Sequence, residues 1–152
     1  MGTVEARFSG FLLLLATLWL GIILWAPYAR SQSWISAEPI YYSFRLICHQ
    51  LAERSFSYFG NSLPVCHRCS GLYLGAWLGL LVLPILARAA GQILRKPKIL
   101  LWFWLPMGID LAIDNTGASR FVTGLVASFP LAPCLLVAWK QFPRLTATPL
   151  TD

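Results

Sequence analysis

Near its beginning the chain carries a nearly unbroken apolar run, Phe11 to Trp25. With the nearby Phe8 and Tyr28, this run approaches the roughly 20 residues that a helix needs to cross the hydrocarbon core of a bilayer. A cleaved signal peptide is the alternative, but it would have a shorter apolar core, a more basic start and a small-x-small cleavage site. The run therefore predicts a membrane-spanning helix at about residues 9–27.

Three further apolar blocks follow, at about residues 70–88, 99–114 and 121–139. Of the 152 residues, 57% are hydrophobic and only 12% are charged, which is far from the balance of a water-soluble domain. Because the apolar residues come in long blocks, we expect an all-α fold. The chain is predicted to form one integral-membrane domain, residues 1–152, built as a four-helix transmembrane bundle.

A mixed, aromatic segment separates the first two predicted spans. Pro39 suits the first position of a helix. Apolar residues then recur at helical spacing, at Ile40, Phe44 and Leu51, while charged residues such as Arg54 take other, solvated faces. We predict a short amphipathic helix at about residues 39–57, lying on the outer face of the membrane.

The formal net charge is +6, but the charges lie between the apolar blocks. The excess is therefore interpreted as a topology signal rather than a nucleic-acid-binding surface, and no nucleic-acid partner is expected. The densest basic cluster follows the second predicted span. It consists of Arg88, Arg95, Lys96 and Lys98. Because short basic loops stay in the cytoplasm, we predict a multi-pass protein of the cytoplasmic membrane with both termini cytoplasmic.

This topology brings polar residues from three separate stretches to the same outer boundary. They are Cys48, His49, Glu53, Cys66, His67, Arg68, Cys69, Asp110, Asp114 and Arg120. Charged groups in a membrane span must find partners or line a cavity. Asp110 and Asp114 are four residues apart and share a helix face, and Arg68 and Arg120 are their expected counter-ions.

Cys66 and Cys69 form a C-x-x-C pair at the start of a predicted span, where the helix dipole favours thiolates. With Cys48 as a third sulfur and His49 or His67 as a fourth ligand, a tetrahedral zinc site can be assembled. A structural disulfide and reactive redox thiols are the alternatives for these cysteines. The order Cys-His-Arg-Cys does not match the haem-attachment pattern C-x-x-C-H, so haem is not expected.

The adjacency of Cys48 and His49 restricts their joint use. In a continuous helix their side chains diverge by about 100 degrees, so both can bind one ion only if the helix is locally unwound. Otherwise one is a ligand and the other faces a substrate. The remaining cysteine, Cys134, lies in the fourth predicted span towards the inner side and is interpreted as a small apolar filler.

Gly71, Gly75 and Gly79 recur at four-residue spacing in the second predicted span. Such a strip of small residues lets another helix approach closely. It predicts a helix-packing partner or a homo-oligomer.

Several of these residues fall in longer motifs. The motifs are Cys48-His49-Gln50, Glu53-Arg54-Ser55-Phe56, the run from Pro64 through Cys66-His67-Arg68-Cys69-Ser70-Gly71 to Gly75, Asp110 with Asp114-Asn115, and Arg120-Phe121-Val122-Thr123-Gly124. In these motifs the chain resembles a family of small prokaryotic integral-membrane proteins known as domain of unknown function 2085. The resemblance covers about residues 42–125.

The resemblance implies one shared site and a prokaryotic inner membrane, but no known chemistry. The residues it supports are Cys48, His49, Cys66, Arg68, Cys69, Tyr73, Asp110 and Arg120. The position of His67 is more freely occupied in such proteins, which weakens it as a ligand.

Our first functional hypothesis is a membrane-embedded, zinc-dependent enzyme that hydrolyses a lipid or amphiphile, or transfers a group from it, as part of lipid metabolism. Zinc would polarise a substrate oxygen or activate water, and Asp110 or Asp114 would move a proton. Arg68 and Arg120 would hold an anionic group, with Tyr73 in the same site. A closed shell of three cysteines and a histidine would instead make the zinc structural.

Two other classes compete with it. An outward C-x-x-C with a further outer cysteine also fits a quinone-linked thiol-disulfide oxidoreductase, although such relays need two cysteine pairs and Cys134 is on the wrong side for the second. The third class is a non-catalytic metal-stabilised adaptor or small carrier.

Overall fold

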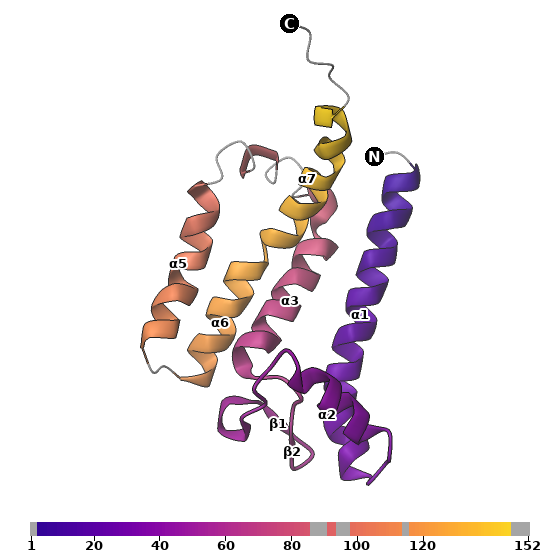
Figure 1. Ribbon diagram of the computed structural model, residues 1–152, viewed down its shortest axis with the longest axis vertical. Coiled ribbons are helices and arrows are strands. Elements are labelled where there is room, and N and C mark those ends of the chain that lie inside the picture. The colour runs from indigo at the N-terminus through magenta and orange to yellow at the C-terminus, as the bar shows by residue number, and fades with distance from the viewer. Residues whose placement is uncertain (1–2, 86–90, 94–97, 114–115, 147–152) are drawn as a thin grey trace, which may run out of the picture.

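The computed structural model describes residues 3–85, 91–93, 98–113 and 116–146 of the chain. These residues are predominantly helical, as expected from the sequence. The elements in order are α1 (Thr3–Ser31), α2 (Ala37–Arg45), a short 3-10 helix η1 (Ala52–Arg54), β1 (Ser57–Tyr58), β2 (Asn61–Ser62), α3 (His67–Leu81), α5 (Lys98–Ala112), α6 (Gly117–Ser128) and α7 (Leu131–Thr146). In Figure 1 the long helices run side by side, with the start of α1 and the end of α7 at the top and α2 and the hairpin at the bottom.

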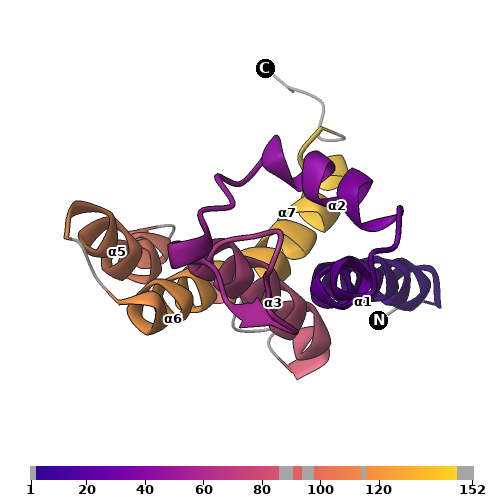
Figure 2. The ribbon, with the colours of Figure 1, turned by 90° about the horizontal axis from the view of Figure 1, so that it is seen from below.

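Helix α1 exposes much of its apolar surface. Leu14, Leu18 and Leu24 are each more than half exposed, at 56%, 55% and 60%. Seen from below, α1 stands beside α3 and α2 rather than inside the helical group (Figure 2). A helix that is apolar yet largely uncovered suits a lipid environment, because burial in hydrocarbon removes its side chains from water.

The predicted four-span bundle is not confirmed. Two helical segments are long and apolar enough to cross a membrane, Arg7–Ser31 and Gly117–Leu136, while the apolar stretch Leu101–Ala112 is shorter. Helices α3 and α5 have 15 residues each, fewer than the roughly 20 of a full crossing. The predicted ends of their spans, at residues 88 and 114, lie outside the described residues.

Helices α3 and α6 make the closest helix contact. Gly71, Gly75 and Gly79 are buried, and a methyl group added to any of them would collide with a backbone carbonyl. Those carbonyls belong to Phe121, Leu125 and Phe129, respectively. The contacts advance together along both helices, so α3 and α6 are parallel. The strip thus allows close approach within the chain, and its use by a second copy or another protein stays a prediction.

The predicted amphipathic helix at 39–57 is too long, because α2 ends at Arg45. The carbonyl of Phe44 accepts the backbone N–H groups of both Ile47 and Cys48, which closes the last turn. Gln50 then adopts a left-handed backbone conformation with φ 52°, and its side-chain amide donates to the Tyr41 carbonyl at 2.6 Å. Tertiary contacts therefore override the helical spacing of the apolar residues.

A small hairpin occupies the second half of that predicted helix. Strands β1 and β2 pair antiparallel with Tyr58 opposite Asn61. Phe59 and Gly60 form the two-residue turn, with φ 50° and 73°. Positive φ at both central residues is the geometry that matches the twist of a tight hairpin.

The fourth predicted span, 121–139, overlaps the membrane-length segment Gly117–Leu136, which contains a turn between α6 and α7. Helix α6 starts earlier, after Thr116, whose hydroxyl accepts the Ser119 N–H at 3.3 Å. Helix α7 follows after a break at Phe129 and Pro130, and the two continue along one line in Figure 1. Pro130 lacks a backbone N–H, which explains the interruption.

Candidate functional site

Three cysteines meet at the lower end of the helices. The Sγ atoms of Cys48, Cys66 and Cys69 all lie within 4.8 Å of one another, and all three thiols are free. Zinc bound at about 2.3 Å from each sulfur would place two sulfurs of a tetrahedral site about 3.8 Å apart. The three sulfurs therefore need only a small contraction to hold one soft metal ion.

The local sequence explains how the sulfurs are brought together. Pro64 and Val65 are fully buried and precede Cys66, the N-cap of α3, whose backbone is extended. Cys69 follows in the first turn of α3. Cys48 is 4% exposed and belongs to an apolar cluster with Ile23, Phe44, Leu63 and Val65.

Hydrogen bonds tie the cluster together. The Cys66 backbone N–H donates to the Cys48 sulfur at 3.1 Å. The pKa of the Cys48 thiol is lowered, mainly because the Cys66 thiol donates a hydrogen bond to it, and the Cys69 thiol acts in the same direction. These hydrogen bonds favour the thiolate of Cys48, which is the form of cysteine that binds metals.

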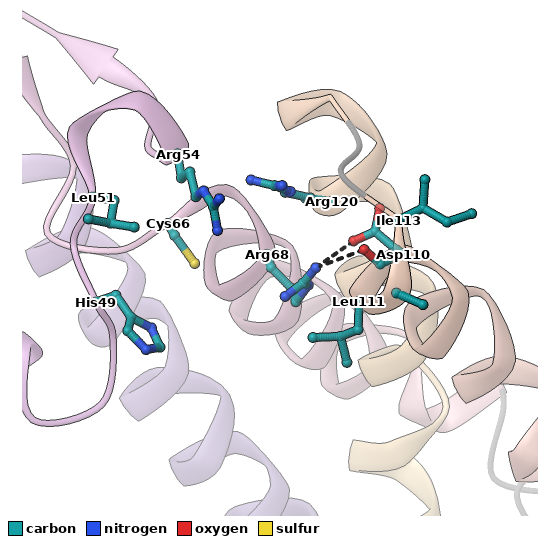
Figure 3. Close-up of a pocket in the computed structure, with 10 residues that line it drawn as sticks. His49, Leu51, Arg54, Cys66, Arg68, Asp110, Leu111, Ile113 and Arg120 are labelled. Atoms are coloured by element: carbon teal, nitrogen blue, oxygen red, sulfur yellow. Dashed lines mark hydrogen bonds and ion pairs between the residues drawn. The ribbon is translucent and has the colours of Figure 1, made fainter.

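His49 does not join the three sulfurs as a candidate ligand. The chain is not helical at residues 48–50, yet this unwinding turns His49 onto the wall of a neighbouring cavity rather than towards the sulfurs (Figure 3). Of the two arrangements considered for Cys48 and His49, the structure places Cys48 with the sulfurs and His49 at the cavity. Within the part of the chain described, the cluster thus offers three protein ligands.

The cavity beside the sulfurs has a volume of about 400 Å³. It is lined by His49, Leu51, Arg54, Cys66, Arg68, Asp110, Leu111, Ala112, Ile113 and Arg120. Cys66 is common to the sulfur cluster and the cavity wall. One side of the wall is cationic and the other, at the end of α5, is apolar and exposed, with Leu111 63% and Ile113 54% accessible.

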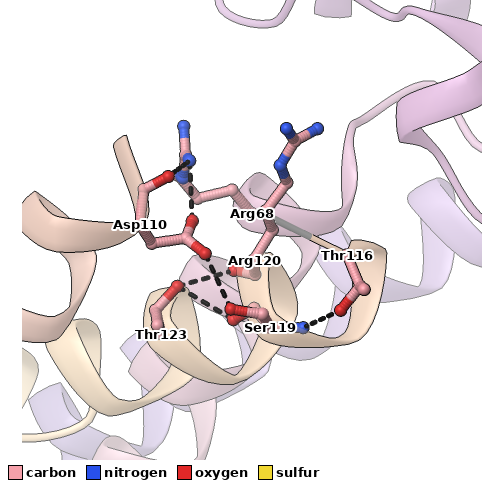
Figure 4. Close-up of polar contacts among 6 residues, drawn as sticks. All are labelled: Arg68, Asp110, Thr116, Ser119, Arg120 and Thr123. Carbon is pink, nitrogen blue, oxygen red and sulfur yellow. Dashed lines mark hydrogen bonds and ion pairs between the residues drawn. The ribbon is translucent and has the colours of Figure 1, made fainter. Parts of the chain in front are cut away.

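Asp110 is the buried charge of the site, at 2% exposure. It accepts a hydrogen bond from Arg68 Nη2 at 2.7 Å and one from Ser119 Oγ at 2.8 Å. Arg68 Nη2 also approaches the Asp110 carbonyl oxygen at 3.4 Å. As Figures 3 and 4 show, this carboxylate joins α5 to both α3 and α6. The predicted pairing of Asp110 with Arg68 is present.

Arg54 is the site residue that sequence reasoning missed. It was interpreted as part of a solvated helix face, but it ends η1 and lines the cavity together with Arg68 and Arg120. Its presence in the Glu53-Arg54-Ser55-Phe56 motif was the signal that could have identified it.

Other predicted residues lie elsewhere or are not described. Tyr73 packs against the apolar cluster and α1, with its ring 6.0 Å from that of Trp19, and is not among the residues that line the 400 Å³ cavity. Asp114 lies outside the described residues. Cys134 is buried, with 2% exposure, on α7.

His67 is neither among the residues that line the cavity nor in the group of candidate metal ligands. The imidazole ring of His67 lies 4.3 Å from the Phe56 ring in an edge-to-face arrangement, and it also packs against Gly117. The pKa of His67 is lowered, first by burial and then by the charge of Arg120. A neutral imidazole held between aromatic and backbone groups fits a packing role.

Exposed apolar helices with a thiol cluster at one end define a helical membrane protein with a candidate metal site. The family model described as "Predicted membrane protein (DUF2085)" matches residues 48–133, more than half of the 152 residues. The chain belongs to this family. The match begins at Cys48 and ends at Pro133, so it includes every residue of the cluster and the cavity.

Two archaeal relatives are similar over 96 residues. An uncharacterized protein of Methanocaldococcus jannaschii is 32% identical, over 59% of this chain and 62% of its own length. An uncharacterized protein of Methanothermobacter thermautotrophicus is 38% identical, over 59% of this chain and 84% of its own length. The first match thus spans less than two thirds of that relative. No solved structure matches the chain.

Proposed function

We propose that this protein is a metal-dependent enzyme, with zinc the expected ion, that acts on an amphiphile at the outer face of the cytoplasmic membrane. One observation carries the proposal: Cys66 belongs both to the three-sulfur cluster and to the cavity wall. A metal held by Cys48, Cys66 and Cys69 would keep its fourth position towards that cavity. Three protein ligands with an open position are typical of catalytic rather than structural zinc.

Different residues of the cavity would have different roles in the reaction. The bound metal would supply Lewis acidity, polarising a substrate oxygen or a water molecule. Arg68 and Arg120 would hold an anionic group of the substrate. The apolar wall at Leu111 and Ile113 would face the hydrocarbon part, which favours an amphiphile over a fully polar substrate. Hydrolysis or group transfer fits these components.

Proton transfer has two sets of candidates. The role predicted for Asp110 or Asp114 stays a prediction. The contacts of Asp110 favour a positioning role, because its two carboxylate oxygens accept hydrogen bonds from Arg68 and Ser119. His49, exposed at the cavity wall, is the better-placed side chain to exchange a proton with a substrate.

The membrane arrangement is part of the proposal. We propose a multi-pass protein with both termini cytoplasmic. The helices lie side by side, with the start of α1 and the end of α7 at the opposite end from the start of α3, and this supports the arrangement (Figure 1). Access of membrane-impermeant thiol reagents to Cys66 from outside intact cells would test it.

The metal is tested on detergent-purified protein. We expect one zinc per chain by mass spectrometry, lost in Cys66→Ser and Cys69→Ser and kept in the matched control Cys134→Ser, since Cys134 is distant in the fold on α7. Lipid extracts from cells with wild-type protein should then differ from those with Cys66→Ser. Metal-free protein in which Cys66 and Cys69 form a reversible disulfide would reject the metal enzyme in favour of the redox alternative. Full zinc with unchanged lipids would favour an adaptor.

A further inference from the structure

The cavity carries more positive than negative charge. Arg54, Arg68 and Arg120 line it, and Asp110 is the one carboxylate among its lining residues in the described part of the chain. Counting Asp114 as well would still leave an excess of one positive charge. Like charges held in one partly apolar cavity repel each other, and an anion between them would relieve that repulsion.

The three guanidinium groups come from separate elements and converge. Arg54 ends η1, Arg68 is the second residue of α3 and Arg120 is the fourth residue of α6. In Figure 3 the side chains of Arg54 and Arg120 point towards one another across the cavity, above Arg68.

Arg68 is oriented by an ion pair that does not use all of its N–H donors. Asp110 fixes its Nη2, while its Nε is buried and has no hydrogen-bond partner in the described structure. A buried, unsatisfied charged donor is costly. A guanidinium has five N–H donors, so Arg68, which Asp110 orients through Nη2, can still donate to an acceptor oxygen in the cavity that it lines.

The N-termini of α3 and α6 add partial positive charge to the same end of the molecule as the three arginines. Because α3 and α6 are parallel, both begin at the cavity end of the molecule, and each contributes a partial positive charge there. Such an end favours an anion whose charge is spread over several oxygens. A carboxylate is satisfied by one bidentate arginine, whereas a phosphate offers three oxygens and more than one charge.

We propose that Arg54, Arg68 and Arg120 bind a phosphate group, carried by a lipid headgroup or free in solution. The inference rests on the proposed function for the metal beside it, because Cys66 lies on the same cavity wall and would present the metal to a bound phosphate ester. It adds Arg54 to the site and names the chemical class of the ligand.

Calorimetric titration of the full-length protein in detergent tests the phosphate site. The probes are dihexanoyl phosphatidic acid, inorganic phosphate and dihexanoyl phosphatidylcholine, whose phosphate is masked by choline. We expect phosphatidic acid to bind more tightly than phosphatidylcholine, and Arg54→Gln to weaken it by about tenfold or more. Arg54 is exposed, so the variant should fold normally. The matched control is Arg45→Gln, an exposed arginine at the end of α2 that does not line the cavity.

The outcomes separate the ligand sources and the two proposals. Inorganic phosphate binding as tightly as phosphatidic acid assigns the site to free phosphate, and a preference for phosphatidic acid assigns it to a headgroup. Equal binding to wild type and Arg54→Gln, or no binding of either phosphate probe, overturns the inference. Zinc is measured on the same samples: a metal-free protein with an Arg54-dependent phosphate site would reject the metal enzyme alone, and a zinc protein without phosphate binding would reject the phosphate site alone.

Discussion

Replacing Asp110 by Asn should strongly destabilise the protein although it hardly changes the shape of the side chain. Asp110 is 2% exposed and receives hydrogen bonds from Arg68 and Ser119 at 2.7 and 2.8 Å. The amide of Asn can still accept from Ser119 but carries no charge opposite Arg68. Removing one partner of a buried pair costs about 3–5 kcal/mol. Because the Arg68 side chain is 24% exposed, water recovers part of this, and we expect about 2–4 kcal/mol.

The loss is measured by denaturant unfolding in mixed micelles, followed by the fluorescence of the seven tryptophans. The control is Glu38→Gln, which removes a surface ion pair with Arg30. The Glu38 side chain is 69% exposed and the Arg30 side chain is 42% exposed. That change should cost less than about 1 kcal/mol. Zinc content should stay unchanged in both variants, because neither residue contributes to the sulfur cluster.

A double-mutant cycle identifies the cause of the Asp110 effect. If the ion pair is responsible, Arg68→Gln combined with Asp110→Asn should cost less than the sum of the single changes by about 1–3 kcal/mol. Costs that add to within about 0.5 kcal/mol would show that Asp110 is not coupled to Arg68. The reasoning from burial and distance would then be refuted, whatever the size of the single effects.

Two further predictions concern packing and pH. Gly75→Ala should cost roughly 1–3 kcal/mol in the same unfolding assay, because the new methyl group collides with the Leu125 carbonyl. The control is Gly10→Ala, whose methyl group meets nothing within 4 Å, so this change should be neutral or stabilising. Equal effects of the two changes would contradict the close contact of α3 and α6. The pKa of Tyr41 is raised above 10.0, chiefly by burial. The unfolded phenol therefore ionises first, so stability should fall as pH rises through about 10, and Tyr41→Phe should flatten that decline.

The sequence predicted the helical class well because long apolar blocks have few other solutions. It also predicted which residues gather at one end, since alternating helix directions bring Cys66, Asp110 and Arg120 to a common boundary. It did not predict the end of α2, because Ile40, Phe44 and Leu51 repeat with helical spacing whether or not the helix continues. What ends α2 is burial of Cys48 among residues distant in sequence, and local spacing carries no record of that contact.

The position of Arg54 was not predicted for the same reason. Once the chain leaves α2 and turns at Gln50, with φ 52°, the following residues follow a path that no periodicity describes. Arg54 then reaches the cavity from η1 instead of pointing into water from a helix. His49 is displaced in the same way, onto the cavity wall and away from the sulfurs. Both differences therefore follow from one reversal of the backbone, which only the packed structure specifies.

The glycine contact connects this architecture to the chemistry of the site. A methyl group at Gly124 would lie 2.5 Å from the Arg68 carbonyl, so the backbones of α6 and α3 touch within one or two turns of Arg120 and Cys69. Two parallel helices in such contact cannot shift independently, and their N-terminal dipoles are held together at the cavity. Gly71, Gly75 and Gly79, interpreted from the sequence as a surface for a partner, contact the same helix pair, so they also help to fix the spacing between the arginines and the cysteines. A site that depends on preformed spacing gains from this, because no ordering is needed when a ligand binds.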